Sequence, residues 1–181
     1  MRKTFIVLLS ALTAGCASTP PLSVEELRYE VKRGAAMTKM LRYEVERPFL
    51  QTYNAIQANA ERCLEVTVAS SQDNPKEGMR ESVKYRTDSL MTSETTGETF
   101  LQVNKKGTEK MPEGGYYVLL ADIEAISSNK TKVVLYGEAY GYDDVHQAVV
   151  AWARGENDDC PKFPVAGYGQ LVSYDNNSPA K

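Results

Sequence analysis

The chain has 181 residues, with 21 lysine and arginine residues against 24 aspartate and glutamate residues, so its formal net charge is −3. Nucleic-acid partners select clustered basic residues, and this mildly acidic chain is therefore not expected to bind nucleic acid. One histidine and three cysteines leave few groups for metal or nucleophile chemistry. The length suits a single folded domain.

The first fifteen residues have the pattern of an export signal. Arg2 and Lys3 give a positively charged start, and the run from Phe5 to Leu12 is apolar apart from one serine. This run is shorter than the roughly 20 apolar residues that a membrane-spanning helix needs. A charged start, a short apolar run and small residues before a cleavage point are typical of a secretory signal.

The end of this segment resembles the lipobox of bacterial lipoproteins. Ala14 and Gly15 precede Cys16, as the small residues precede the lipidated cysteine in that family. The resemblance implies that residues 1–15 are cleaved and that Cys16 becomes the acylated first residue. One position departs from the family pattern, because Thr13 stands where leucine is usual and Leu12 lies one step earlier. An ordinary secretory signal cut at another small residue is the alternative.

The residue after the cysteine bears on the location of the protein. In many Gram-negative species an aspartate there retains a lipoprotein in the inner membrane, whereas this chain has Ala17. The resemblance therefore implies the periplasmic face of the outer membrane. Several acyl chains on one cysteine would anchor the chain stably, which one chain does not. Loss of Arg2 and Lys3 with the leader brings the mature charge to about −5.

Cys63 and Cys160 remain once Cys16 is assigned to lipidation. In an oxidising periplasm such a pair predicts a disulfide, which would stabilise the fold by roughly 4–5 kcal/mol in the chain-entropy model. A metal or redox pair is the alternative. Neither cysteine belongs to a Cys-x-x-Cys motif, and a single histidine is a poor supply of further zinc ligands.

Residues 16–35 are expected to form a lipidated tether with a possible short helix. Small and proline residues in 17–22 would hold the domain off the membrane. Ser23 followed by Glu26 has the form of a capping box, which predicts a helix through about Arg33.

The domain itself is predicted over residues 36–163. Alternation from Met37 to Val45 predicts a half-buried strand, with Met37 on its apolar face. Apolar residues at three- and four-residue steps from Phe49 to Leu64 predict a long amphipathic helix, with Cys63 on its buried side. Val66 and Val68 suggest a brief strand after this helix. Longer strands are expected in four ranges: 80–90, 98–104, 116–125 and 132–140, the last two joined by a hairpin at 127–130.

The predicted order closes with a second helix. Asp143 stands at the expected N-cap and Gly155 at the expected end, while the tail 164–181 offers little apolar surface and is expected to be flexible. This order predicts an α+β fold in which a meandering antiparallel sheet carries the long helix and the C-terminal helix on one face. The arrangement resembles helix-grip domains.

Candidate catalytic or metal-binding groups are few. His146 with Asp143 and Asp144 could form a small metal or acid–base site, but a helix start with helix-dipole-stabilised acids and an exposed histidine is the simpler interpretation. Residues 157–159, Asn-Asp-Asp, lack the spaced ligands of a calcium loop and suggest an acidic turn. We therefore expect neither a metal nor another cofactor, and assign no catalytic residue.

Two further groups of residues have competing interpretations. Asp122 and Glu124 could be paired carboxylates, although they more simply mark the solvent-facing side of a strand. Five tyrosines gather at the predicted hairpin and its exit. A row of them on the outer face of the sheet could bind a partner protein or glycan, whereas ordinary cross-strand packing would also explain Tyr116, Tyr117, Tyr136, Tyr140 and Tyr142.

The sequence favours a non-enzymatic envelope lipoprotein that acts by binding or as a structural component. Its order of signal, strand, helix and sheet resembles that of small bacterial lipoproteins of uncharacterised function. Its expected partners are the membrane, through the anchor, and another envelope protein. A carrier or sensor of a small amphipathic ligand held between helices and sheet is the alternative, and an envelope hydrolase is a third hypothesis.

Overall fold

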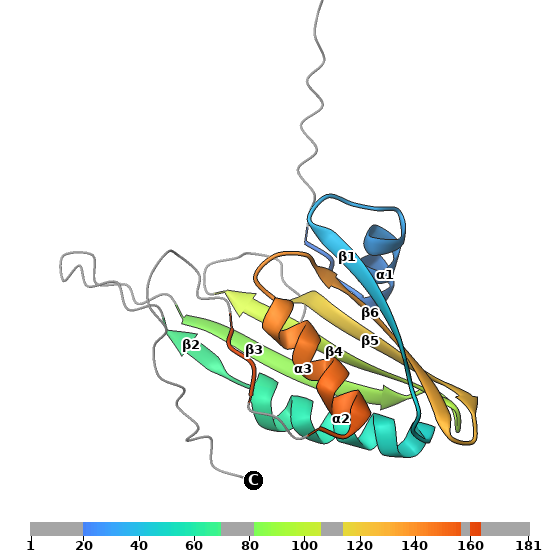
Figure 1. The fold of residues 1–181 in the computed structure, drawn as a ribbon. Helices are drawn as coiled ribbons and strands as arrows, with labels where there is room; N and C mark the ends of the chain where they lie inside the picture. Colours follow the sequence, from blue (N-terminus) through green and yellow to red (C-terminus); the bar gives the residue numbers. More distant parts are fainter. Residues whose placement is uncertain (1–19, 70–81, 106–113, 157–159, 164–181) are drawn as a thin grey trace, which may run out of the picture.

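The computed structural model describes residues 20–69, 82–105, 114–156 and 160–163. Within these ranges the chain is an α+β domain in which helices cover a six-stranded antiparallel sheet (Figure 1). The predicted export signal, Cys16, the acidic residues 157–159 and the tail 164–181 lie outside the described residues. The expectations about them therefore stay predictions.

The elements follow one another in an order close to that expected from the sequence. They are α1 (Val24–Lys32), β1 (Thr38–Val45), α2 (Phe49–Leu64), β2 (Thr67–Ala69), β3 (Ser82–Met91), β4 (Thr96–Lys105), β5 (Tyr116–Ser127), β6 (Lys130–Glu138) and α3 (Asp143–Arg154). The apolar spacing that predicts a helix from Phe49 to Leu64 coincides with α2.

The sheet has the strand order β1-β6-β5-β4-β3-β2. Strands β3 to β6 form a meander, and β1 adds to it on the free side of β6, with Leu41 opposite Leu135. Met37 does not belong to β1, contrary to expectation. It precedes the strand with a left-handed backbone angle (φ 65°), and its side chain is 67% exposed.

The two faces of the sheet carry different helices. Leu119, Ala121 and Ile123 of β5 belong to the main core, to which α2 and α3 also contribute. The side chain of Leu120 belongs to a smaller cluster formed with α1. Helices α2 and α3 therefore share one face, as predicted, whereas α1 covers the other face, a placement that no local sequence pattern indicated.

Helix α1 begins with a side-chain cap. The Ser23 hydroxyl accepts a hydrogen bond from the backbone N–H of Glu26, and the Glu26 carboxylate accepts one from the N–H of Leu22. These two contacts satisfy N–H groups near the start of the helix. The buried side of α1, formed by Leu27 and its neighbours, packs on Leu120 of the sheet.

A disulfide joins Cys63, near the end of α2, to Cys160, beyond the end of α3. The two Cα atoms are 5.1 Å apart, and 97 positions separate the residues in the sequence. Phe163 follows this link and packs on Tyr85 of β3, with 4.3 Å between ring centroids. The predicted disulfide is confirmed, and it ties the segment after α3 to the main core.

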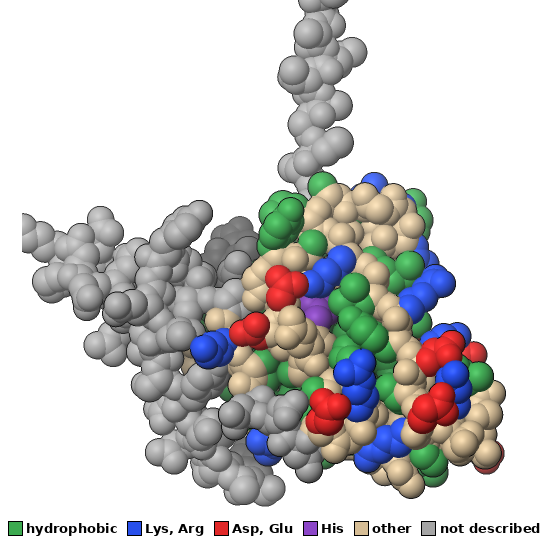
Figure 2. Space-filling model, in the orientation of Figure 1, with side chains coloured by type: hydrophobic (Ala, Val, Ile, Leu, Met, Phe, Trp, Pro, Cys, Tyr) green, Lys and Arg blue, Asp and Glu red, His purple; other side chains and the backbone are tan. Residues whose placement is uncertain are grey.

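The described chain starts at Pro20, at the end of the domain that the α1–β1 loop also occupies. Pro20 and Pro21 line the same hollow as Ala35, Ala36 and Met37 of that loop. Figure 2 shows a few hydrophobic side chains at this end, scattered among other atoms. This end of the domain becomes the candidate site.

Candidate binding groove

The five tyrosines do not form a single exposed row. Tyr142 and Tyr136 are buried, Tyr116 and Tyr117 are half-buried, and Tyr140 is 68% exposed. Tyr142 enters the main core, where its hydroxyl and that of Tyr85 form a hydrogen bond. Of the two interpretations of the tyrosines, the partner surface does not hold for Tyr136 and Tyr142. Each of these two side chains packs in a hydrophobic cluster, as the packing alternative has it.

Burial has a marked effect on this pair of phenols. It raises the pKa of Tyr85 to about 12 and raises the pKa of Tyr142 still further. Both groups therefore stay neutral in the physiological range, which matches a packing role. The Tyr136 ring lies under α1, with the Lys32 ammonium 5.7 Å from its centroid.

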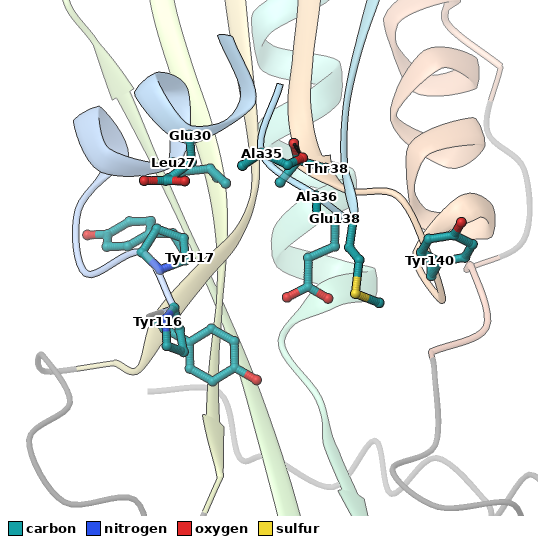
Figure 3. A pocket seen from close by; sticks show the side chains of 12 residues that line it. Leu27, Glu30, Ala35, Ala36, Thr38, Tyr116, Tyr117, Glu138 and Tyr140 are labelled. Carbon is teal, nitrogen blue, oxygen red and sulfur yellow. Dashed lines mark hydrogen bonds between the residues drawn. The ribbon is translucent and has the colours of Figure 1, made fainter. Parts of the chain in front are cut away.

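The remaining three tyrosines line one groove of about 280 Å³, which we call the tether groove (Figure 3). Its walls come from five segments: Pro20 and Pro21 of the predicted tether, α1, the α1–β1 loop, the start of β5 and the residues around the end of β6. Its lining includes Pro21, Leu27, Met37, Tyr116, Tyr117 and Tyr140.

Backbone hydrogen bonds fix the position of this groove. The N–H of Tyr117 donates to the carbonyl of Pro21 over 3.0 Å, which holds the tether against the start of β5. The N–H of Ala139 donates to the carbonyl of Met37 over 2.7 Å, so the pairing of β1 with β6 continues to the rim. The Thr38 hydroxyl donates to the Ala35 carbonyl and closes the loop between them.

The groove is mainly apolar and aromatic, with two carboxylates. Glu30 and Glu138 contribute the carboxylates, and the latter lies between the Tyr116 and Tyr140 side chains in Figure 3. Burial raises the pKa of Tyr117, so its hydroxyl stays protonated. Aromatic rings with polar tips suit contact with an apolar or amphipathic group.

His146 lies in the core and not on the surface. It is 2% exposed, and its Nδ1 lies 2.7 Å from the Tyr142 carbonyl oxygen, which makes Nδ1 the protonated nitrogen. Burial, with a smaller contribution from the Lys39 charge, lowers the pKa of His146 to about 4. The expected exposed histidine is therefore wrong, because α3 buries a wider face than its apolar stripe indicated.

The first of the two acids beside this histidine is paired with a lysine. Asp143 is the first residue of α3 rather than its N-cap, which is Tyr142. Its carboxylate accepts a hydrogen bond from the Lys39 ammonium, and this bond lowers the pKa of Asp143. Asp144 is exposed.

Asp122 is partly covered by α1 and does not simply face solvent. The Arg28 guanidinium donates to its carboxylate over 2.8 and 3.2 Å, and also to Glu98. The hydrogen bond with Asp122 raises the pKa of Arg28, which stays charged. Glu124 pairs instead with Lys132 on the neighbouring strand. The two carboxylates therefore belong to separate ion pairs.

The described residues contain no group of three or more histidine, cysteine, aspartate or glutamate side chains placed to hold a metal ion. None of the described helices is long and apolar enough to cross a membrane. No protein-family model matches the chain, and no curated protein matches it either.

Sequence reasoning identified the tyrosines but missed the tether groove, because its walls come from five segments. The sequence did contain two signals. Pro20 and Pro21 stand where the tether meets the domain, and the apolar run Ala35-Ala36-Met37 follows Gly34 at the end of the first helix. Only the folded chain brings these segments to the start of β5.

Proposed function

We propose that this chain is a lipoprotein anchored by acyl chains on Cys16 to the periplasmic face of the outer membrane, and that it acts by binding and not by catalysis. The observation that carries the proposal is the position of the tether groove. Pro20 and Pro21 line it, and only four positions separate Pro20 from the proposed lipidation site. The groove is thus the binding surface beside the anchor.

The lining of the groove supports binding as its role. Half-buried Tyr116 and Tyr117 present large ring surfaces that lose little side-chain entropy on contact, and exposed Tyr140 extends this surface outward. Such amphipathic aromatic residues are enriched where proteins meet partners. The walls are also held by backbone hydrogen bonds at Pro21 and Met37, so the surface is largely formed before a partner arrives.

The anchor is tested by replacing the proposed lipid-bearing residue. The Cys16→Ser variant should lose the lipid and leave the membrane fraction, because no acyl chain can then be attached. Intact-mass measurement of the natural protein should show acyl groups on Cys16 as the first residue. A Thr13→Leu variant restores the usual family residue and should be processed at least as completely as the natural chain. A natural protein with a bare Cys16 would contradict the proposal.

The binding surface is tested by photo-crosslinking in intact cells. A photoreactive residue at Tyr140 should give more adduct than one at Tyr29, which is also exposed but lies outside the groove lining. Both replaced residues are surface tyrosines, so the two variants are closely matched. Equal adduct yields at both positions would contradict a binding role for the groove.

A second candidate function is the capture of a small amphipathic ligand. The volume of about 280 Å³ lies near the lower end of small-molecule sites, and the mainly apolar and aromatic lining suits an amphipathic ligand. The space between α2, α3 and the sheet is less suited to this role, since buried side chains such as Ile56 and Trp152 fill it. Native mass spectrometry should detect a bound ligand that a Tyr117→Ala variant loses, and its absence from both proteins would contradict this function.

A further inference from the structure

The short link between the anchor and the domain restricts how the domain can lie. Four peptide units separate Cys16 from Pro20, and an extended chain of this length spans at most about 14 Å. The carbonyl of Pro21 is held by the N–H of Tyr117 at the start of β5. The tether groove therefore lies within this reach of the lipidated residue, if Cys16 carries the acyl chains.

The rim of this groove exposes apolar side chains. Met37 is 67% exposed and Tyr140 is 68% exposed, and both line the groove. Leu22, next to Pro21 in the chain, is 47% exposed. Exposed apolar groups that stand together on a surface mark a place where a partner or a membrane binds.

The chemistry of the rim matches the interfacial region of a bilayer. Tyrosine places its ring among the upper acyl segments and its hydroxyl among the headgroups. Leucine and methionine side chains can enter the same layer, as the apolar side of an interfacial helix does.

We propose that Leu22, Met37 and Tyr140 rest in the interface of the bilayer that holds the anchor, so that the tether groove faces the membrane. This inference rests on the proposed lipidation of Cys16, and it names the lipid bilayer surface as the partner of the groove. The domain then stands on its tether end, with the long axis of the sheet directed away from the membrane.

The opposite end of the domain provides a matched control. Leu50 and Ile126 are also exposed there, and Ile126 is 48% exposed beside the β5–β6 turn. Strand β5 begins at the tether groove and ends at this turn, and its 12 residues span about 36 Å. In the proposed orientation this distal apolar surface is too far from the bilayer to enter it.

The test uses the lipidated full chain in vesicles of phosphatidylethanolamine and phosphatidylglycerol. A polarity-sensitive fluorophore is attached to a cysteine introduced by Met37→Cys or, as the control, by Ile126→Cys. Lipids with brominated acyl chains should quench the first label at least about threefold more than the second, because it lies about 5–10 Å inside the headgroup boundary. Equal quenching, or stronger quenching at Ile126, would overturn the proposed orientation.

Two further measurements separate the possible failures. Vesicle flotation reports the anchor alone: a natural chain that does not float, like Cys16→Ser, overturns both the anchor and the orientation. If the chain floats but the labels at Met37→Cys and Ile126→Cys are quenched equally, only the proposed orientation is overturned. Leu22→Ser combined with Tyr140→Ser should reduce quenching of the Met37→Cys label about twofold or more by removing apolar contact. Leu50→Ser should leave it unchanged, and an equal effect of both changes would also count against the proposal.

Discussion

The two faces of the sheet are covered in different ways. On one face, α2 and α3 bury a continuous apolar core that includes Ile56, Leu135 and Trp152. On the other face, the nine-residue α1 packs on a small cluster around Leu120. The guanidinium of Arg28 in this helix also forms ion pairs with Glu98 and Asp122. The first face is held mainly by burial, and the second by limited burial together with charge.

This difference predicts two levels of stability. The core under α2 and α3 is closed by a disulfide and should open only when the whole domain unfolds. The contact of α1 is smaller, and its ion pairs are partly open to solvent. Local opening is expected where few apolar contacts hold an element, so α1 should separate from the sheet before global unfolding.

The largest expected effect comes from the disulfide on the first face. Replacing both Cys63 and Cys160 with serine should lower the free energy of unfolding by about 4–5 kcal/mol, because a long loop of the unfolded chain is no longer constrained. Urea unfolding of the variant and the natural protein measures this difference. A loss below about 1 kcal/mol would mean that the disulfide adds little to the main core.

A pair of core truncations compares the two faces directly. Ile56→Ala should lower the free energy of unfolding by about 3–4 kcal/mol, since this fully buried side chain leaves a cavity in the main core. Leu27→Ala removes a side chain of similar size from the α1 cluster and should lower it by only about 1–2 kcal/mol, because α1 can separate locally. Equal losses in urea unfolding would contradict the proposed difference between the faces.

The acid dependence of stability should come largely from the first face. The pKa of His146 is lowered from 6.5 to about 4 in the folded protein, so the unfolded chain binds more protons between these values. Stability is therefore fully present above pH 6.5 and decreases as the pH falls toward 4, by about 3 kcal/mol.

The control for this acid dependence is His146→Gln, which keeps an amide donor near the Tyr142 carbonyl and does not titrate. Its free energy of unfolding should change less between pH 6.5 and pH 4 than that of the natural protein. Parallel pH curves for the two proteins would show that His146 is not responsible.

The charge cluster on the second face should respond to salt. Arg28→Met leaves Glu98 and Asp122 facing one another without a cation and should lower the free energy of unfolding by about 1–2 kcal/mol at low salt. This loss should shrink as salt screens the partly exposed charges. Arg42→Met removes an exposed arginine from β1 and should change stability by less than about 0.5 kcal/mol. Similar losses for both variants would contradict a specific role of Arg28.

The helices and strands of the face covered by α2 and α3 could be predicted from the sequence, because each depends on a local pattern of apolar residues. The spacing from Phe49 to Leu64 follows the helical period, and Leu119, Ala121 and Ile123 stand at every second position of β5 on the side of the main core. Cys63 lies on the apolar side of its helix, which made the disulfide consistent with packing of both helices on one face.

The side chains that sequence reasoning misplaced are those whose surroundings come from distant segments. His146 and Tyr142 are polar residues near the start of α3, but α3 packs against both α2 and the sheet, which widens its buried face. Asp122 alternates correctly to the outer face of β5, yet α1 covers that position and supplies Arg28. The local spacing of apolar residues does not predict these contacts.

The order of amino acids alone predicts the α+β class and the disulfide between Cys63 and Cys160. It also predicts the helix and strand ranges on the face that α2 and α3 cover. These properties depend on side-chain periods within single elements and on the small number of cysteines. The placement of α1 on the second face, the burial of His146 and the tether groove depended on the tertiary structure. Each of them forms where segments far apart in the chain meet. The free energy of such contacts depends on side chains from several segments at once, so the pattern of one segment does not predict it.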